Sequence, residues 1–190
     1  MNIFASNICP YRAAFDLPDK LVIKMVLESA QLLSSAVQYW NRSIEDPELN
    51  VTNLYKETLT LEPVSIWAKK DIANFCWLLH HALGLVYEYR IRYDKRHKST
   101  TQIEEALGWY LRNFGMVRFF VDRHKIKNFV MMMPPEYRSD NPTTSYKVYL
   151  QQKKSHYATW RFPSKKPRWW VAKCKHDSYR HREDRSCLIV

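Results

Sequence analysis

Apolar residues recur at helical spacing from Asp19 to Trp40, the most periodic stretch of the chain. At about 100° per residue, one narrow arc collects Val22, Val26, Ala30, Leu33, Val37 and Trp40. The opposite side carries a polar stripe made of Lys20, Lys24, Glu28, Gln31, Ser35, Gln38 and Arg42. Because further apolar residues flank the arc, this pattern predicts one long helix that is packed over most of its circumference.

Weaker patterns of the same period predict three more helices, over residues 65–93, 99–113 and 143–156. Ser99 and Gln102 have the spacing of a capping box, which favours a helix start at Ser99. Residues 43–63 are expected to form a loop with at most a short helical turn. We therefore predict a mainly α fold, organised as a single compact helical domain.

A small β element is the most that the rest of the pattern allows. Residues 2–8 read as a short strand or an extended lead-in that ends at Cys9-Pro10. Residues 116–133 fit either a strand or a helix followed by a strand. The part from 129 to 133 is the candidate partner of the N-terminal segment.

Length and charge divide the chain into a core and an extension. The 190 residues, 46% of them hydrophobic, suffice for one helical core domain, which we place at residues 1–160. Residues 161–190 hold nine Lys and Arg against three Asp and Glu, and so supply +6 of the net +11. This basic, aromatic extension favours an anionic partner, with nucleic acid ahead of an anionic membrane surface or an acidic protein.

Several kinds of chemistry are excluded by what the sequence lacks. With three glycines in all, it has no P-loop, dinucleotide fingerprint or nucleophile elbow, so no cofactor is indicated. Its first residues contain no apolar run that fits a signal peptide, and no stretch is apolar enough to predict a membrane span. The four cysteines form no C-x-x-C pair, which favours a reduced, cytosolic protein.

Two motifs in the extension point to other chemistry. A zinc site could use Cys174, His176, His181 and Cys187, but their spacing matches no standard finger, so no metal site is predicted. The last four residues, from Cys187 to Val190, have the C-a-a-X form that directs prenylation in eukaryotic cells.

Two groups of polar residues are candidate sites. The polar stripe either faces water or presents Lys20, Lys24 and Glu28 as a row that could hold a phosphate or pair an amine with an acid/base carboxylate. Residues 87–99 place five cations among three tyrosines, the best phosphate-binding candidate in the chain, although a solvated charged stretch explains them equally well.

Four blocks of sequence resemble a family of small, largely uncharacterised proteins of tailed bacteriophages. The blocks contain Asp19, Lys20, Lys24 and Glu28; then Pro63, Trp67, Asn74 and Trp77; then Glu88, Arg92, His97 and Lys98; and finally Glu136, Tyr146, Tyr149, Lys153 and Trp160. Where the family pattern has three histidines, this chain has Phe15, Leu21 and Glu62, which puts imidazole chemistry at those positions in doubt. The resemblance implies DNA metabolism in the cytoplasm of an infected bacterium, and it disfavours prenylation.

The first functional hypothesis is a DNA base-modifying or glycosylase-like enzyme whose site lies between helices. Lys20 or Lys24 would be the amine or a phosphate ligand, and Glu28 the acid/base. The remaining groups would bind the nucleic acid: Arg92, His97 and Lys98 on the backbone, Asn74 as an orienting group, Trp67 or Tyr146 stacked on a base, and Lys153 in the same set.

The second hypothesis is a non-catalytic accessory protein that binds nucleic acid, or a host or phage protein, through its basic face and aromatic extension. The absence of a cofactor motif favours this second hypothesis, whereas the polar pairs on helices favour the first. A metal-dependent nuclease is a weaker third hypothesis, because acidic residues are sparse and scattered.

Overall fold

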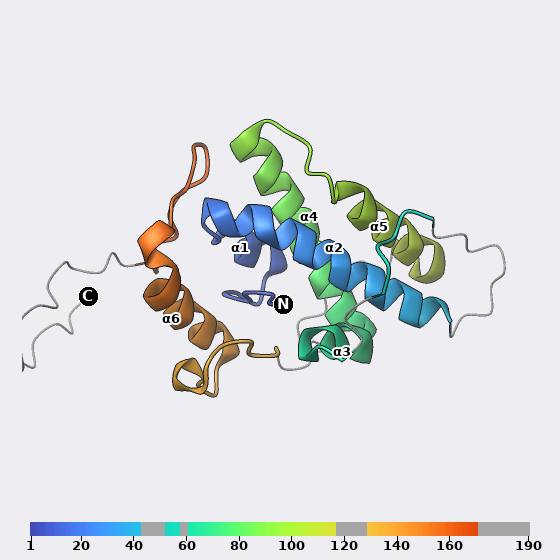
Figure 1. Cartoon of the computed structure of the whole chain (residues 1–190), viewed down its shortest axis with the longest axis horizontal. Helices are drawn as coiled ribbons and strands as arrows, with labels where there is room; N and C mark the ends of the chain where they lie inside the picture. Colours follow the sequence, from blue (N-terminus) through green and yellow to red (C-terminus); the bar gives the residue numbers. More distant parts are fainter. Residues whose placement is uncertain (43–51, 58–60, 117–128, 171–190) are drawn as a thin grey trace, which may run out of the picture.

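The computed structural model describes residues 1–42, 52–57, 61–116 and 129–170. Their helices are α1 (Pro10–Phe15), α2 (Asp19–Asn41), α3 (Pro63–Lys70), α4 (Ile72–Tyr93), α5 (Thr100–Phe114), η2 (Pro135–Tyr137), α6 (Pro142–Lys154) and η3 (Ser155–Tyr157). The predicted mainly α fold is confirmed. In Figure 1, α2 and α4 cross at the centre, α5 and α3 lie toward one end, and α6 lies at the other.

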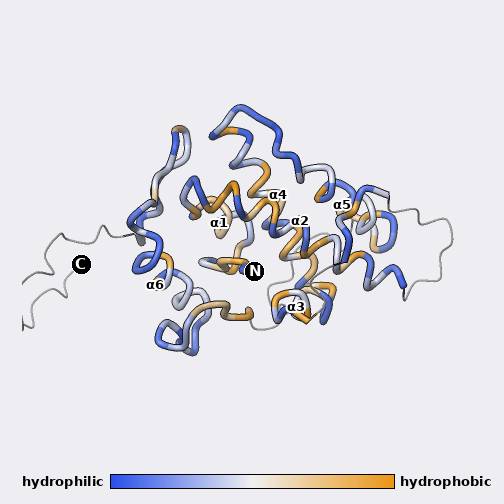
Figure 2. Tube along the Cα trace, in the orientation of Figure 1, coloured by the Kyte–Doolittle hydropathy of each residue, from blue (hydrophilic) through white to orange (hydrophobic). Residues whose placement is uncertain are grey.

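The core follows the predicted apolar arc of α2. Val22, Val26, Ala30, Leu33 and Val37 are completely buried. Figure 2 shows that hydrophobic residues concentrate along α2 and α4, whereas hydrophilic residues follow the end of α4 and much of α6. Because burial of apolar area dominates folding free energy, the crossing of α2 and α4 is the frame against which α1, α3 and α5 pack.

The predicted helix over residues 65–93 is two helices, which corrects that expectation. The backbone of Asp71 is extended, at φ −152° and ψ 139°, and its side chain accepts the amide N–H of Ala73 at 2.9 Å. Asp71 is therefore the N-cap of α4, and the chain turns between α3 and α4. An aspartate inside a long apolar pattern was the available signal for this break.

The short helix α1 was absent from the prediction, which placed an end of structure at Cys9-Pro10. Pro10 is instead the first residue of α1, where a proline lacks only an N–H that would have no intrahelical partner. Gly84 of α4 allows α1 to approach closely, because a Cβ at this position would lie 3.0 Å from the Cβ of Ala14. This approach sets α1 directly against α4.

The predicted β pairing is wrong: the described residues contain no strand. One side-chain hydrogen bond nevertheless joins the two segments, and another ties the second segment to α6. Asn2 donates from Nδ2 to the carbonyl of Met132 at 2.8 Å, and the Tyr146 hydroxyl donates to the carbonyl of Val130 at 2.6 Å. Of the ambiguous stretch 116–133, residues 117–128 lie outside the described part of the chain.

The helix predicted from Ser99 is confirmed as α5, but the capping box is not formed. The Ser99 side chain makes no cap hydrogen bond; its Oγ pairs with the Tyr55 hydroxyl at 3.0 Å instead. At the other end, Gly115 adopts φ +67°, a conformation that suits glycine, and ends α5. The first turn of α5 is therefore left without a side-chain cap.

His81 lies fully buried in α4 and stacks on Trp77, with ring centroids 5.0 Å apart. Within the described residues neither of its ring nitrogens has a hydrogen-bond partner. Burial lowers the pKa of His81 to about 3, so the folded protein keeps this imidazole neutral. The unfolded chain, in contrast, takes up a proton at the ordinary histidine pKa of about 6.5.

We expect His81 to make the protein acid-sensitive. As the pH falls below about 6.5, only the unfolded state binds the proton, so stability decreases by about 1.4 kcal/mol per pH unit until the folded-state pKa is reached. In urea unfolding at several pH values, His81→Leu should lose less stability on acidification than the unsubstituted protein, by roughly 2 kcal/mol between about pH 6.5 and 4.5. Equal losses in both proteins would contradict this expectation.

Candidate functional site

A buried network centred on Arg92 joins the ends of four segments. Arg92 lies near the end of α4, and its side chain is fully buried. Its Nε donates to Glu88 at 2.7 Å, and Nη1 donates to the carbonyl of Leu17 at 2.8 Å and to Asp19 at 3.2 Å. Nη2 reaches the carbonyl of Phe15 at 3.3 Å. The predicted backbone clamp Arg92 is thus occupied by internal partners.

The same two carboxylates bind the segment that follows η3. Asp19 accepts the Thr159 hydroxyl at 2.8 Å and the amide N–H of Arg161 at 3.1 Å. Glu88 accepts the Ser164 hydroxyl at 2.6 Å. The guanidinium of Arg161 consequently lies over the ring of Tyr93, 4.9 Å from its centroid. Residues 161–170 therefore contact the helical core; the zinc and prenylation motifs lie at 171–190, outside the described residues.

Every charged side chain from Pro142 to Trp170 is a cation. The set comprises Lys147, Lys153, Lys154, Arg161, Lys165, Lys166 and Arg168. We call residues 142–170 the α6 basic segment. The side chains at 153, 161, 165, 166 and 168 are exposed. The segment itself contains no carboxylate, and the nearby Asp16 and Glu136 lie against Lys147 and Lys153. The exposed cations at 161, 165, 166 and 168 therefore give this end of the molecule its positive field.

Aromatic rings hold several of these cations in place. Lys147 lies over Trp169 at 5.8 Å, Lys153 over Tyr137 at 5.5 Å and Lys154 over Tyr149 at 5.6 Å. A pocket of about 630 Å³ lies in the same segment, and its lining includes the cation Lys166 together with Gln152, Ser155, His156, Ala158, Trp160 and Trp170. Cations interleaved with aromatic rings beside a hollow are the arrangement that phosphates and bases need.

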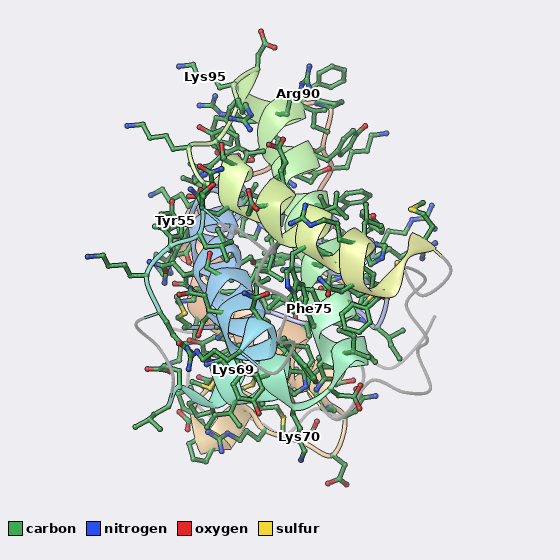
Figure 3. All side chains as sticks on the ribbon, turned by 90° about the vertical axis from the view of Figure 1, so that its right-hand side faces the viewer. Tyr55, Lys69, Lys70, Phe75, Arg90 and Lys95 are labelled. Atoms are coloured by element: carbon green, nitrogen blue, oxygen red, sulfur yellow. The ribbon has the colours of Figure 1, made fainter. Side chains whose placement is uncertain are left out.

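A second basic site lies where α4 passes into α5. This pocket, which we call the α4–α5 pocket, has a volume of about 360 Å³ and is lined by Val86, Arg90, Asp94, Lys95, Arg96, His97, Thr100 and Glu104. In Figure 3 the side chains of Arg90 and Lys95 lie together at the far end of α4 from Lys69 and Lys70. Three of the five cations in the predicted cluster of residues 87–99, Arg90, Lys95 and Arg96, therefore line a concave surface.

His97 stabilises the loop between α4 and α5 through a backbone hydrogen bond and a ring contact. Its Nδ1 accepts the amide N–H of Ser99 at 3.1 Å, and Tyr89 contacts its ring at 4.9 Å. Burial lowers its pKa, against the opposing effect of a hydrogen bond to the backbone of Ile23. His97 is thus held by contacts within the protein, whereas its neighbour Lys98 is exposed.

The predicted row on α2 is only partly assembled. Lys24 pairs with Glu28 at 3.1 Å, and Glu28 also accepts the amide N–H of Asn2 at 3.1 Å. Glu28 is buried but Lys24 is exposed. Lys20 points elsewhere, over the ring of Tyr157 at 5.5 Å. The stripe is therefore neither wholly solvated nor a single three-residue site.

Three predicted ligand-binding residues lie in the core. Trp67 is 3% exposed and packs against Trp77, with centroids 6.1 Å apart. Asn74 donates from Nδ2 to the carbonyl of Trp67 at 2.9 Å. Tyr146 is completely buried, and burial raises its pKa. These side chains hold α3, α4 and α6 in the core, away from any surface that a base could reach in this conformation.

One polar pocket was missed by the sequence reading. Lys69 of α3 pairs with Glu57 at 3.0 Å, Arg42 binds the same carboxylate, and Tyr39 lies beside them around a hollow of about 410 Å³. Burial, and then the charge of Arg42, lower the pKa of Lys69. Glu57 comes from a stretch without periodicity, so no sequence signal pointed to this pairing.

Neither a metal centre nor a known relative adds to this picture. Across residues 1–42, 52–57, 61–116 and 129–170, no group of three or more His, Cys, Asp or Glu side chains could hold a metal ion. No helix in that same part of the chain is long and apolar enough to cross a bilayer. No family model, curated protein or solved structure matches this chain.

Proposed function

We propose that this protein binds nucleic acid through the α6 basic segment. The observation that carries the proposal is that this segment has seven cations and no carboxylate, with five of the cations exposed. Contacts between such cations and phosphates release counterions, and this release supplies much of the affinity of nucleic-acid-binding proteins. A generic surface would intersperse both signs of charge.

The fixed position of the segment supports the same proposal. The hydrogen bonds of Thr159 and Ser164 to Asp19 and Glu88 hold the chain against α2 and α4, so the cations that follow start from a defined place. A segment that is already ordered loses less conformational entropy on binding than a free tail does. DNA is our choice of partner because of the resemblance to phage proteins, which also suggests the host bacterial cytoplasm.

The test is fluorescence anisotropy with single- and double-stranded DNA over a range of salt concentrations. We expect binding that persists near 150 mM salt, with a preference for one strand form, since a shaped site adds contacts beyond charge. Binding that vanishes by that salt concentration, equally for both strand forms, would show that the net charge of +11 supplies only a nonspecific attraction. A host or phage protein partner would then become the better candidate.

A DNA-modifying enzyme is the second candidate, and one observation favours it. Glu28 is a buried carboxylate in contact with a lysine, at 3.1 Å, which is the pairing that acid/base chemistry on an amine requires. The Lys69–Glu57 pair supplies a second arrangement of the same type.

Glu28→Gln discriminates the enzyme from the binder. If Glu28 is the acid/base, product formation, measured by mass spectrometry of nucleosides after incubation with DNA, should fall by about 10²-fold or more while DNA affinity is kept. Lys56→Ala, an exposed change away from Glu28, is the control and should leave both quantities unchanged. No product from the unsubstituted protein, or equal product from both, counts against the catalytic role.

A further inference from the structure

The pocket in the α6 basic segment differs from the other two pockets described above in the charge of its lining. We call this hollow of about 630 Å³ the Trp160 pocket. Its lining contains no carboxylate, and its one Lys or Arg side chain is that of Lys166. The α4–α5 pocket and the hollow beside Lys69 both include Asp or Glu side chains. The lining of the Trp160 pocket therefore holds no negative charge that would repel a phosphodiester strand.

Two tryptophans form the aromatic part of this lining. The rings of Trp160 and Trp170 meet edge to face, with centroids 4.9 Å apart and planes at 77°. Trp170 is only 3% exposed, so it supports the ring of Trp160, which is partly exposed. Gln152 and Ser155 add hydrogen-bonding groups to the same lining. A stacking surface beside such groups is what proteins use to hold an unpaired base.

Hydrogen bonds to the helical core fix both tryptophans in place. The residues before and after Trp160 are both bonded to Asp19, the first through its hydroxyl at 2.8 Å and the second through its amide N–H at 3.1 Å. Trp169, which precedes Trp170, donates from Nε1 to Asp16 at 3.0 Å. In Figure 1 the chain accordingly leaves α6, makes a loop and returns toward α6. Because the pocket is ordered in advance, binding a ligand there costs less conformational entropy.

The ring of Phe162 is a second stacking surface, two residues after Trp160. Its side chain is 90% exposed, and no large hydrophobic side chain in the described part of the chain is more exposed. The cations Arg161, Lys165 and Lys166 around it in sequence are exposed as well. Exposed rings among exposed cations are the arrangement in which bases stack on the protein while the cations contact the phosphates between them.

We infer that the α6 basic segment binds single-stranded nucleic acid, with one unpaired base on Trp160 in its pocket and a neighbouring base on Phe162. The bases of an intact duplex are stacked on one another, so their faces cannot reach either ring. Lys165 and Lys166 contact the phosphates beside these bases. The inference rests on the proposed function and adds to it the strand form and the two rings that select that form.

The test removes the bases of the strand and keeps its phosphates. Fluorescence anisotropy near 150 mM salt compares an oligothymidine with a strand of equal length in which tetrahydrofuran residues replace the nucleosides, and with a duplex of that length. We expect the oligothymidine to bind roughly 100-fold tighter than the base-free strand, at about tenfold for each stacked base. Charge alone predicts equal affinities, because the two strands carry the same phosphates.

Substitutions test whether Phe162 and Trp160 are the rings concerned. Phe162→Ala removes an exposed side chain, so the fold should persist. It should lower the affinity for oligothymidine about tenfold and leave the affinity for the base-free strand unchanged. Leu61→Ala, which removes another exposed side chain, at 85% exposure, is the control outside the segment and should change neither affinity. Unchanged oligothymidine binding by Phe162→Ala, or equal losses for both strands, contradicts the inference.

Trp160→Ala should have the same selective effect as Phe162→Ala, provided that circular dichroism shows it to be folded. Because this substitution also removes the contact with Trp170, a second measurement uses the unsubstituted protein. Photo-crosslinking to a strand that contains 5-bromouracil, followed by mass spectrometry of peptides, should attach the strand to the peptide that contains Trp160 and Phe162. Crosslinks confined to other peptides overturn the inference.

The outcomes separate this inference from the proposed function. Equal affinities for the oligothymidine and the base-free strand overturn the base site and leave binding through charge in place. Binding of the duplex alone has the same meaning for both statements. If no strand and no duplex binds, the proposed function fails, and the inference fails with it.

Discussion

Replacing Lys153, Lys165 and Lys166 together by alanine is expected to weaken DNA binding by roughly 100-fold at low salt, at about 1 kcal/mol for each lost phosphate contact. The plot of log affinity against log salt should also become shallower by roughly 2 to 3, because each phosphate contact contributes about 0.9 to its slope. All three side chains are exposed, so the fold should persist. Fluorescence anisotropy over a salt series measures both quantities.

The matched control removes the same charge elsewhere. Lys56, Lys70 and Arg112 are not fully buried and lie outside the α6 basic segment, and Figure 1 places α3 and α5 away from α6. Their replacement by alanine should change the slope by less than about 1, since they contact no phosphate in this proposal. Equal losses in the two triple variants would show that binding follows net charge alone.

Arg92→Ala is expected to lower the free energy of unfolding by about 3 to 5 kcal/mol, because it leaves two buried carboxylates without their partner. Those carboxylates are Asp19 and Glu88, at 5% and 4% exposure. Urea unfolding followed by circular dichroism measures the loss. Arg90→Ala, an exposed change two residues earlier on α4, should cost less than about 0.5 kcal/mol.

A further variant, Arg92→Lys, separates an anchoring role of Arg92 from direct phosphate binding. If Arg92 only anchors, then the fraction of Arg92→Lys that is folded should bind DNA as the unsubstituted protein does, although the protein is less stable. If Arg92→Lys instead has normal stability and a large loss of DNA affinity, Arg92 contacts the DNA backbone directly. The burial of its side chain, at 0% exposure, is the reason for expecting the first result.

Periodicity was sufficient to predict the helices that form the core, because amphipathic spacing reports directly on which face is buried. It identified α2 within a residue or two and located α5 and α6. It failed at Asp71, where one N-cap hydrogen bond outweighs a continuous apolar pattern, and at Pro10, which was interpreted as a break although it begins α1. Both failures are local capping effects within a pattern that spans many residues.

The candidate sites were less predictable, because their contacts join residues far apart in sequence. The separation between Arg92 and Asp19 is 73 residues, and that between Ser164 and Glu88 is 76. Sequence could show that Arg92 is a cation in a basic cluster, but only the packing of α1, α2 and α4 shows that it is internal. Glu57 and Lys69 likewise meet only through the fold, in a pairing without a local signal.

The most direct measurement is lysine footprinting: acetylation with and without DNA, read residue by residue by mass spectrometry of peptides. Binding through the α6 basic segment should protect Lys153, Lys165 and Lys166 from acetylation. Lys56 and Lys70 are exposed as well, and they should react at unchanged rates. Protection of Lys56 and Lys70 to the same degree as the other three, or protection of none, would contradict the proposal that this segment is the nucleic-acid interface.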